Sequence, residues 1–485
     1  MRWDGIPHTY EANNRMSDFY QNLYNPANAA TFVAGSNYNA ISPTSPGLGT
    51  SPNKTLAGTQ FYLNGIGIEG QNGIPQGMVK NYWTDFGPRI GFAYDLRGDH
   101  KTVVRGGFGI MYERIQGNDM YDGGPNQPFS TSVTFNNVSI SNPGAALSTG
   151  TAYTNPITVG SITGLSYSDY KAPASYQYSI GVERELARNT VLSVSYVGNQ
   201  NRHQSDERQI NLPNGDPKSL ASLNTLGGSV PYNSAVPYLG YNSILLYENA
   251  GNSHYNSLQM NLHSQVSRDL TLQVAYTASR AIDPTTGGDL YTLSNPYNRA
   301  YDNGPAPLDR TNIGLVNFIY ELPFFRSSQS QMLHTVAGGW EVSGIVTMES
   351  GLPLFINQGG SLSSNGVANA TNRPNFTGSV NEPGSRLNFF STTGFSNPAV
   401  GQWGNLSKGL FRGPGRNNWN ISLFKSFALS ESHQSRRIEL RVETFNTWNH
   451  TEFNGVSTGF GSSNFGQVTS TWDPRVFQLG GKFLW

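Results

Sequence analysis

Residues 254–280 have the sequence HYNSLQMNLHSQVSRDLTLQVAYTASR, in which apolar and polar side chains alternate on both sides of a short polar link. In the first half, Leu258, Met260 and Leu262 share one face and are separated by polar residues. The segment 270–277 repeats this pattern at every second position. A period of two indicates a β-strand whose faces lie in different surroundings, because successive side chains point to opposite faces. The stretch therefore predicts an antiparallel hairpin with one apolar and one polar face.

The same alternation recurs along most of the chain, whereas helical periodicity is nearly absent. We expect about eleven strands, near residues 89–96, 101–112, 175–186, 190–199, 254–266, 269–279, 310–321, 338–349, 416–427, 436–447 and 475–485. An all-β, antiparallel fold follows from this pattern.

The links between these segments alternate in length. Short links at 97–100, 187–189 and 267–268 alternate with long ones rich in Gly, Asn, Ser, Thr and Pro, at 113–174, 200–253, 280–309, 350–415 and 448–474. Links of intermediate length, 322–337 and 428–435, fall where a short one is due. Soluble sandwiches and propellers do not require short and long links to alternate, whereas outer-membrane barrels have short periplasmic turns and long extracellular loops. The link lengths therefore favour a transmembrane β-barrel.

The amino-acid composition excludes several classes of function. The 485 residues include 31 basic and 31 acidic side chains and no Cys, and aromatic residues make up 12%. Balanced charge argues against nucleic acid as the main partner, because binding to phosphates requires a basic face. The lack of Cys excludes disulfides, cysteine-type zinc sites, iron–sulfur clusters and thiol catalysis. No run of about 18 apolar residues predicts a transmembrane helix, but transmembrane strands need only about 9–11 residues.

Tyrosines mark the long-loop ends of two hairpins. Tyr176 and Tyr196 begin and end one hairpin, and Tyr255 and Tyr276 begin and end another. Tyrosine suits a membrane–water interface because its ring is apolar and its hydroxyl is polar. A solvent-exposed tyrosine ladder on a soluble sheet explains the same pattern, so the tyrosines alone leave both interpretations open.

The C-terminal eleven residues, RVFQLGGKFLW, end in an aromatic side chain. Gln478 and Lys482 lie on one face of the expected strand, and Gly481 interrupts the alternation on the other. The apolar side chains of that other face resemble the signal recognised by the outer-membrane barrel-assembly machinery: Phe477, Leu479, Phe483 and Trp485. The alternative is a buried terminal strand of a soluble domain.

Charged residues in the strand before it alternate with apolar ones. If Ile438, Leu440 and Val442 contact lipid, the charges between them point into the barrel, where a polar lumen accommodates them. We expect lumen-facing charges at Glu439, Arg441, Glu443 and Lys482, with Lys482 near Glu439 across the last hairpin.

No catalytic, cofactor or metal site is expected. Residues 455–459, GVSTG, match the nucleophile-elbow pattern but lie in a Gly/Ser/Phe loop with no following helix. Gly106, Gly107 and Gly109 resemble a phosphate-binding loop but lie inside a strand. Residues 283–289 could bind calcium in an extracellular loop, although a simple turn explains them as well. The histidines lack paired metal-binding spacing.

Four segments resemble the TonB-dependent outer-membrane receptors and transporters, in their Oar-like subgroup. They are DFGPRIGFAYDLRGDHKTVVRGGFGIMYE (85–113), FRGPGRNNWNISLFKSF (411–427), RIELRVETFNTWNHTEFN (437–454) and FGQVTSTWDPRVFQLGGKFLW (465–485). The resemblance implies that 85–485 form the C-terminal part of a 22-stranded barrel in the outer membrane of a Gram-negative bacterium. No plug domain, TonB-contacting segment or export signal is matched. An odd strand count ending in the periplasm then predicts missing strands upstream, with 1–84 an extracellular loop region exposed by truncation.

The expected function follows from this resemblance. The barrel supplies a wall for solute uptake, its loops capture a ligand such as an oligosaccharide or peptide, and TonB acts only through the absent plug. The expected partners are therefore membrane lipid, the barrel-assembly machinery and the missing plug and barrel half, without nucleic acid. The alternative is a secreted or surface-exposed β-rich adhesin that binds carbohydrate and never inserts in a membrane. The adhesin predicts neither alternating link lengths nor a terminal aromatic residue.

Overall fold

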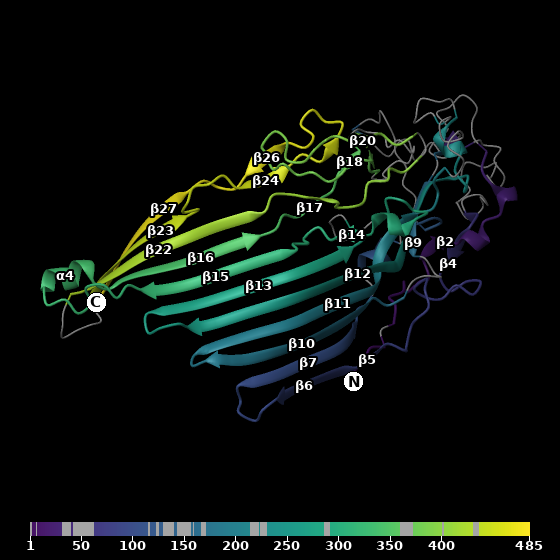
Figure 1. Cartoon of the computed structure of the whole chain (residues 1–485). Helices are drawn as coiled ribbons and strands as arrows, with labels where there is room; N and C mark the ends of the chain where they lie inside the picture. Colours follow the sequence, from purple (N-terminus) through teal and green to yellow (C-terminus); the bar gives the residue numbers. More distant parts are fainter. Residues whose placement is uncertain are drawn as a thin grey trace.

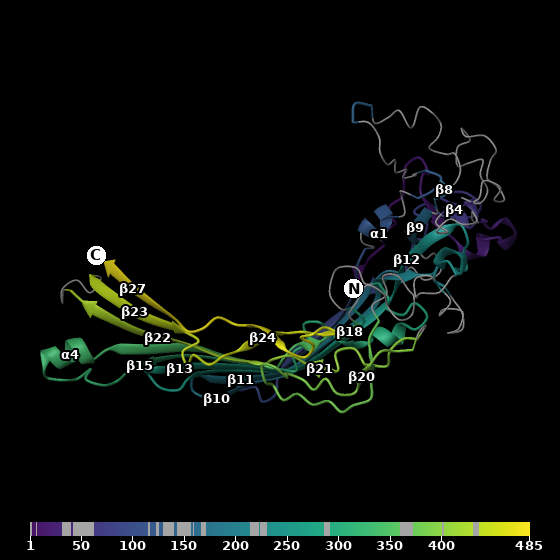
Figure 2. The same ribbon diagram turned by 90° about the horizontal axis from the view of Figure 1, so that it is seen from above.

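One large antiparallel sheet dominates the computed structural model, and it curves without closing into a barrel (Figures 1 and 2). The structure describes residues 2–5, 7–31, 40–41, 63–114, 117–122, 126–129, 140–142, 157–158, 160–165, 171–213, 223, 230–285, 292–358, 372–399, 402–429 and 436–485. Parts of the region 1–84 and of the long loops expected to capture ligand lie outside these residues.

Eleven strands cross the sheet in chain order, each antiparallel to the next. They are β6 (Arg89–Asp95), β7 (Thr102–Tyr112), β10 (Ala174–Ala187), β11 (Thr190–Gln209), β12 (Tyr241–Gln265), β13 (Leu270–Asp283), β15 (Asn312–Glu321), β16 (Trp340–Glu349), β22 (Arg416–Ala428), β23 (Arg437–Phe445) and β27 (Val476–Leu484). All eleven predicted strands are confirmed. The first and last of them, β6 and β27, form the two open edges of this sheet.

Two of these strands are much longer than predicted. The link 200–253 was expected to be a loop, but β11 continues to Gln209 and β12 begins at Tyr241. The prediction was wrong here because the extension lacks alternating apolar residues, while its backbone ladder continues past irregularities at Asn201 and Gln204. The extension also pairs in parallel with β9 (Gly160–Leu165).

Tight turns join the strands at the end of the sheet that we call the turn end. Between β6 and β7, the Asp95 carboxylate accepts hydrogen bonds from the backbone N–H groups of Arg97, Gly98 and His100. Between β10 and β11, Asn189 adopts a left-handed conformation with φ 59°, which asparagine tolerates better than most residues. The intermediate link 322–337 contains a short helix, α4 (Gln331–Ala337), whose N-cap Ser330 accepts from the Leu333 N–H.

Short elements gather at the opposite end, which we call the loop end (Figure 1). They are β1 (Arg2–Trp3), β2 (Ser17–Phe19), β3 (Ala40–Ile41), β4 (Ile66–Ile68), β5 (Phe86–Gly87), α1 (Gly117–Asp122), β8 (Ile157–Thr158), β14 (Gly304–Pro305), β17 (Pro353–Leu354), β18 (Asn357–Gln358), β19 (Asn375–Phe376), β20 (Phe395–Ser396), β21 (Phe411–Arg412), β24 (Phe453–Val456), β25 (Gly459–Phe460) and β26 (Val468–Thr471). Among the described residues, no helix has the length and apolar character needed to cross a membrane.

The buried apolar clusters of the described chain lie at this loop end. Near the N-terminal region, Phe19 packs with Ile162, Tyr241 and Ile244, and Tyr20 packs with residues of a neighbouring cluster. A third cluster lies in the loop that follows β16, and residues of the loop that follows β23, such as Phe465, pack against it. Its buried members are Ile356, Phe389, Phe390, Leu406 and Phe411. We call these clusters together the loop-end core. Segments far apart in sequence thus form a packed structure at one end of the sheet.

Candidate functional site

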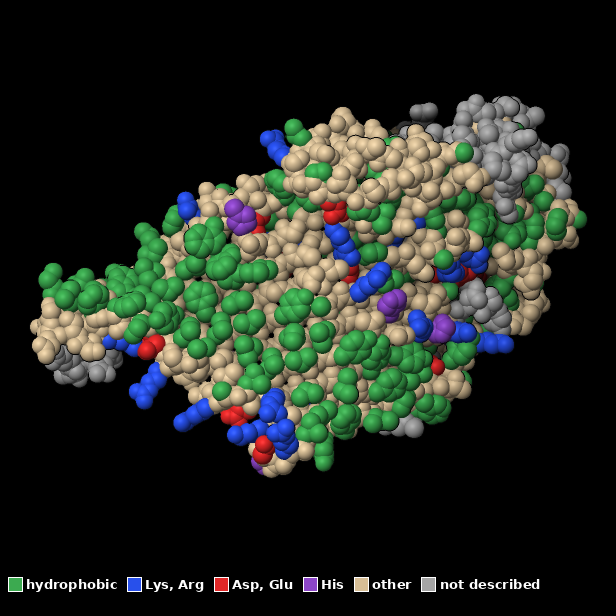
Figure 3. All heavy atoms as spheres, viewed as in Figure 1, with side chains coloured by type: hydrophobic (Ala, Val, Ile, Leu, Met, Phe, Trp, Pro, Cys, Tyr) green, Lys and Arg blue, Asp and Glu red, His purple; other side chains and the backbone are tan. Residues whose placement is uncertain are grey.

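Strand pairing sorts the sheet into one apolar and one polar face. Residues directly opposite each other in an antiparallel pair share a face, so the register extends each alternating pattern across all eleven strands. The apolar face carries, among others, Ile90, Phe92, Phe108, Ile180, Val182, Leu192, Val194, Leu258, Met260, Leu262, Leu272, Val274, Val316, Phe318, Val342, Val346, Ile421, Leu423, Leu440, Val442, Phe477 and Leu479. In Figure 3, hydrophobic side chains spread over the strands, and charged ones gather at the turn end and toward the loop end.

This apolar face is exposed. Ile180 retains 54% of its accessible surface and Leu479 retains 78%. An exposed contiguous apolar surface of this extent is characteristic of an interaction surface and is rare on soluble monomers. Lys425 is an exception on this face, and its ammonium group reaches the Gly338 carbonyl at the turn end. This geometry removes the charge from the middle of the face.

Aromatic rings cover glycines on neighbouring strands of the apolar face. Phe92 lies opposite Gly106, Tyr178 opposite Gly198, and Phe318 opposite Gly344. A Cβ at any of these three glycines would overlap the facing ring. The rings therefore fill the space that a side chain would occupy, a known way of pinning strand register. This explains Gly106 better than a phosphate-binding loop does.

Hydrogen-bonded tyrosines border the apolar face on the loop side. Tyr178 and Tyr196 both donate to Asn256 Oδ1, at 3.1 and 2.7 Å, and their rings stack with centroids 6.2 Å apart. On β13, Tyr276 donates to Asn312 Oδ1 at 2.6 Å. Each ring lies on apolar surface while its hydroxyl is satisfied, which is the arrangement suited to an interface between hydrocarbon and water.

The structure places the predicted charges on the polar face. Glu439 lies directly opposite Lys482 in the register of β23 and β27. Along β23, Arg437 Nε approaches Glu439 Oε1 at 2.8 Å, and Arg441 Nη1 approaches Glu443 Oε1 at 3.6 Å. These charges therefore alternate in sign along one strand. That they face a lumen stays a prediction.

The four residues of the expected assembly signal lie on the apolar face or continue its alternation. Phe477 and Leu479 are largely exposed, and Trp485 retains 86% of its surface. The rings of Phe483 and Trp485 stack with centroids 5.9 Å apart. Their recognition by an assembly machinery stays a prediction.

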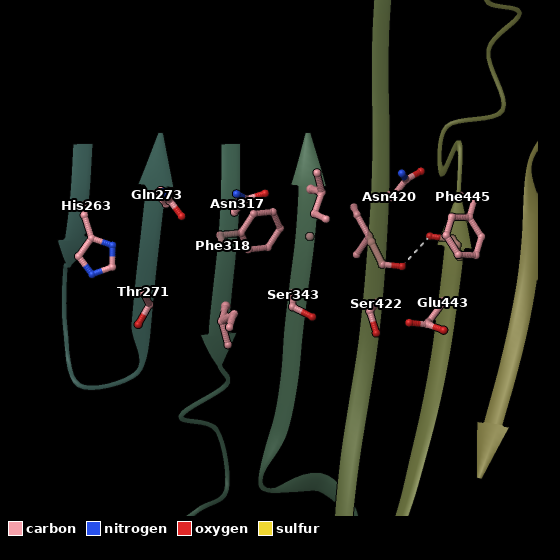
Figure 4. A pocket seen from close by; sticks show the side chains of 15 residues that line it. His263, Thr271, Gln273, Asn317, Phe318, Ser343, Asn420, Ser422, Glu443 and Phe445 are labelled. Atoms are coloured by element: carbon pink, nitrogen blue, oxygen red, sulfur yellow. Dashed lines mark hydrogen bonds between the residues drawn. The ribbon is translucent and has the colours of Figure 1, made fainter. Parts of the chain in front are cut away.

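A concavity of about 520 Å³ lies along the polar face and is lined by residues of six strands (Figure 4). Its lining mixes polar side chains such as His263, Gln273 and Asn317 with the apolar Ile319 and Ile345. Sequence reasoning missed this site because its apolar members interrupt the expected polar alternation. The mixture suits contact with a protein surface or an amphipathic solute more than a channel containing only water.

Sequence reasoning also missed a network of charges at the loop end. Arg299 contacts both Asp206 and Glu248, and Arg208 binds Glu248 through two hydrogen-bonded nitrogens. Asp206 and Glu248 are buried, and burial makes such a pair costly unless it is well hydrogen-bonded. The charged run Ser205–Arg208 is the only local sequence signal, and it does not identify Arg299.

The described residues contain no group of three or more His, Asp or Glu side chains suited to hold a metal ion. Part of the segment 283–289, which we considered for calcium, lies outside the described residues. Residues 455–459 span β24 and β25 and precede no helix. In this loop Ser457 Oγ donates to Asn464 Oδ1 at 3.0 Å, and no histidine contact with it is observed among the described residues.

Comparisons with known proteins show which family this chain resembles. A family model described as an outer membrane beta barrel domain matches residues 1–478, whereas no curated protein matches the chain. Among solved structures, the outer membrane transporter YddB from Escherichia coli is 10% identical with a TM-score of 0.46, covering 82% of this chain and 40% of that protein. The ferripyoverdine receptor of Pseudomonas aeruginosa is 10% identical with a TM-score of 0.36, over 86% of this chain and 34% of the receptor.

A further solved structure, the siderophore receptor PiuA from Acinetobacter baumannii, is 7% identical with a TM-score of 0.37, over 82% of this chain and 35% of that receptor. The chain thus spans 40% or less of the length of these three proteins. The family match confirms the predicted outer-membrane fold and location. Because that match covers almost the whole sequence, the chain belongs to the outer membrane β-barrel domain family and is located in the outer membrane of a Gram-negative bacterium.

Proposed function

We propose that the chain forms part of the wall of a TonB-dependent transporter of the Oar-like type. One observation carries the proposal: the strands expose an apolar face, whereas the buried apolar clusters found among the described residues lie at the loop end. In this proposal residues 85–485 contribute the wall, and residues 1–84 stay with the loops on the extracellular side. Closure of the barrel, the plug and coupling through TonB are contributed by parts of a larger protein.

The polar face is the proposed lumen. Its concavity and the charge row on β23 provide polar and apolar contacts for a plug or a passing solute. The alternating signs on β23 limit the net field along the wall, so neither cations nor anions are strongly excluded. An adhesin that never inserts would leave this apolar face in water at a large free-energy cost, which disfavours that alternative.

We propose an oligosaccharide or a peptide as the captured solute. At the loop end, Tyr297 retains 52% of its surface and meets the ring of Trp403 edge to face, with centroids 6.2 Å apart. The indole nitrogen of Trp403 is fixed by a 3.1 Å hydrogen bond to the Ser294 carbonyl. A fixed aromatic pair offers apolar surface to a sugar ring or a peptide side chain at little entropic cost.

Uptake in the source bacterium tests this function. Cells that lack the gene would be compared with complemented cells for uptake of fluorescent maltoheptaose and of a labelled heptapeptide, with and without a protonophore. We expect one probe to enter only complemented cells and only when the membrane is energised. Complementation with Trp403→Ala should reduce its entry without lowering the amount of protein in the outer membrane. Equal entry of both probes in all strains would contradict the proposed solute classes.

A further inference from the structure

We propose that the link between β15 and β16, residues 322–337, inserts apolar side chains into the phospholipid leaflet on the periplasmic side of the outer membrane. This link contains α4 and projects beyond the strands at the turn end (Figures 1 and 2). The inference goes beyond the transport proposal. It rests on the assignment of the apolar face to lipid, with the turn end directed toward the periplasm.

The link exposes large apolar side chains that the short turns of the sheet lack. Its exposed apolar members are Phe324, Phe325, Met332, Leu333 and Val336. The turns at 97–100, 187–189 and 267–268 have the sequences RGDH, ARN and SR, without a large apolar residue. Apolar area left in water is costly, and its concentration in one link indicates an interaction surface.

The apolar side chains of α4 share one side of the helix. Met332 and Val336 are four residues apart, and Leu333 precedes Val336 by three, so the three side chains form one stripe. The remaining side of the helix carries the polar residues Gln331, His334 and Thr335. A helix with one apolar and one polar side suits the boundary between headgroups and acyl chains, where its apolar side reaches about 5–10 Å deep.

The charges of the link are compatible with a phospholipid surface. Residues 322–337 include no acidic side chain, and their basic side chains are Arg326 and His334. Arg326 contacts Glu321 and donates to the Asp269 carboxylate at 2.6 Å, so both of these carboxylates are neutralised. The link therefore brings no unpaired negative charge of its own toward anionic phospholipids.

The height of the link relative to the tyrosine border matches this boundary. On β15, Gly314 lies opposite Tyr276 of the border, and Tyr320 lies six residues closer to the turn end. Six residues span roughly 20 Å along a strand, or roughly 14 Å along the membrane normal at a tilt of about 45°. The apolar band of membrane barrels is about 25 Å tall. Roughly 10 Å of the band thus lies beyond Tyr320, where the link is located.

The link is also continuous with the apolar face, which favours lipid over a protein as its partner. In Figure 3, the hydrophobic side chains of the strands continue onto the projecting end labelled α4 in Figure 1. Trp340 of this face donates its indole N–H to the Val336 carbonyl at 3.0 Å. Lys425, on the same face, is 3% exposed and donates to the Gly338 carbonyl just after the link. These contacts hold the link beside the lipid-facing strands.

Spin labels test which surroundings the link meets. The sequence contains no Cys, so a single introduced cysteine can be labelled with a nitroxide. Met332→Cys and Val336→Cys probe the apolar stripe, Thr335→Cys on the other side of the helix is the matched control, and Ile180→Cys on β10 is the lipid reference. Each full chain would be labelled in mild detergent and reconstituted into vesicles of phosphatidylethanolamine and phosphatidylglycerol. Paramagnetic resonance would then measure collisions of the label with oxygen, which concentrates in lipid, and with a water-soluble nickel chelate.

We expect the labels replacing Met332 and Val336 to favour oxygen over the chelate at least threefold, as the label replacing Ile180 does. The label replacing Thr335 should show the opposite preference. Equal chelate access on both sides of the helix would overturn the proposal, because the link would then lie in water and be open to a protein partner. Shielding of the stripe from both reagents would also overturn it, because the stripe would then pack against the chain itself. Chelate access at the Ile180 position would overturn both this inference and the assignment of the apolar face on which the proposed function depends.

Discussion

The strands and the loop end of this chain place their apolar side chains in opposite surroundings. At the loop end, Phe390 and Ile244 are fully buried at 0% exposure, as in a soluble protein. On the strands, Ile180 and Leu479 remain mostly exposed. The hydrophobic effect thus stabilises the loop end by burying apolar side chains in its interior. On the strands it favours transfer of a whole apolar face into lipid. The same chain therefore folds in two solvents, lipid around the strands and water around the loop end, and the tyrosine border lies where they meet.

The largest effect on the amount of inserted protein is expected from a charge on the apolar face. Leu440→Arg adds a guanidinium on the lipid side, directly opposite Lys425, and such a charge costs about 2–4 kcal/mol at the bilayer midplane and less toward the interfaces. We expect this variant to disappear from the outer-membrane fraction. Its neighbour Arg441 lies on the polar face, so Arg441→Leu should insert normally. Immunoblots of separated membranes check both variants, and equal insertion of the two would contradict the assignment of the faces.

At the loop end, we expect the largest destabilisation from removing the charge of one arginine in the buried ion-pair network. Arg299→Met leaves Asp206 and Glu248, both buried, without this cation. Removing one partner of a buried ion pair typically costs about 3–5 kcal/mol. We expect the loop end to become sensitive to proteinase K added to intact cells, while the amount of inserted protein stays the same. A parallel loss of insertion would show that the two regions do not fold separately.

Register within the sheet is the next feature to test. Gly198→Ala forces the Tyr178 ring off its neighbour and breaks its hydrogen bond to Asn256. Overpacking of this kind costs about 1–3 kcal/mol. The matched change Gly91→Ala meets only an ordinary contact, with the Gly106 carbonyl at 3.6 Å. Thermal unfolding of the two variants in detergent should therefore differ, and equal melting temperatures would contradict a structural role for the covering rings.

The strands were predictable from sequence because their signal is local. Leu258, Met260 and Leu262 show their common face without reference to any other segment. Tyr196 and Tyr276 mark where that face ends, whereas Tyr255 lies on the polar face. The loop-end core had no such signal. Phe390 contacts the rings of Phe411 and Phe465, and these come together only through the fold. Asp206 and Arg299 likewise lie far apart in sequence, so the partner of each charge was not predictable.

The C-terminal residues are expected to affect assembly more than stability. Phe483→Ser combined with Trp485→Ser removes two exposed rings that few other side chains contact. If they form the assembly signal, the amount of inserted protein should fall several-fold, while the protein that does insert should melt at the native temperature. Lys482→Gln, next to Phe483 but on the polar face, is the control. Lower thermal stability without lower insertion would indicate a packing role instead.

The smallest expected effect concerns a buried lysine at the loop end. Lys408 is 3% exposed, and its ammonium group donates to the Asp283 and Thr285 carbonyls. Burial lowers the pKa of Lys408 to about 8, against the opposing influence of Asp283 and Asp302. In the unfolded chain a lysine titrates near 10.4, so between about pH 8 and 10.4 the unfolded state binds more protons. Raising the pH through this window should therefore stabilise the loop end, by about 1–3 kcal/mol at most.

Thermal unfolding of the loop end, followed by tryptophan fluorescence at pH 7.5 and 9.5, checks this sign. Lys408→Met should remove the increase, because the side chain keeps its apolar contacts and loses its titrating group. The strands expose their polar face to water, so their unfolding should change little over the same range. A native loop end that is less stable at pH 9.5 than at pH 7.5 would contradict the burial of an unfavourable charge. The two regions would then differ in their solvent but not in how they respond to a charge.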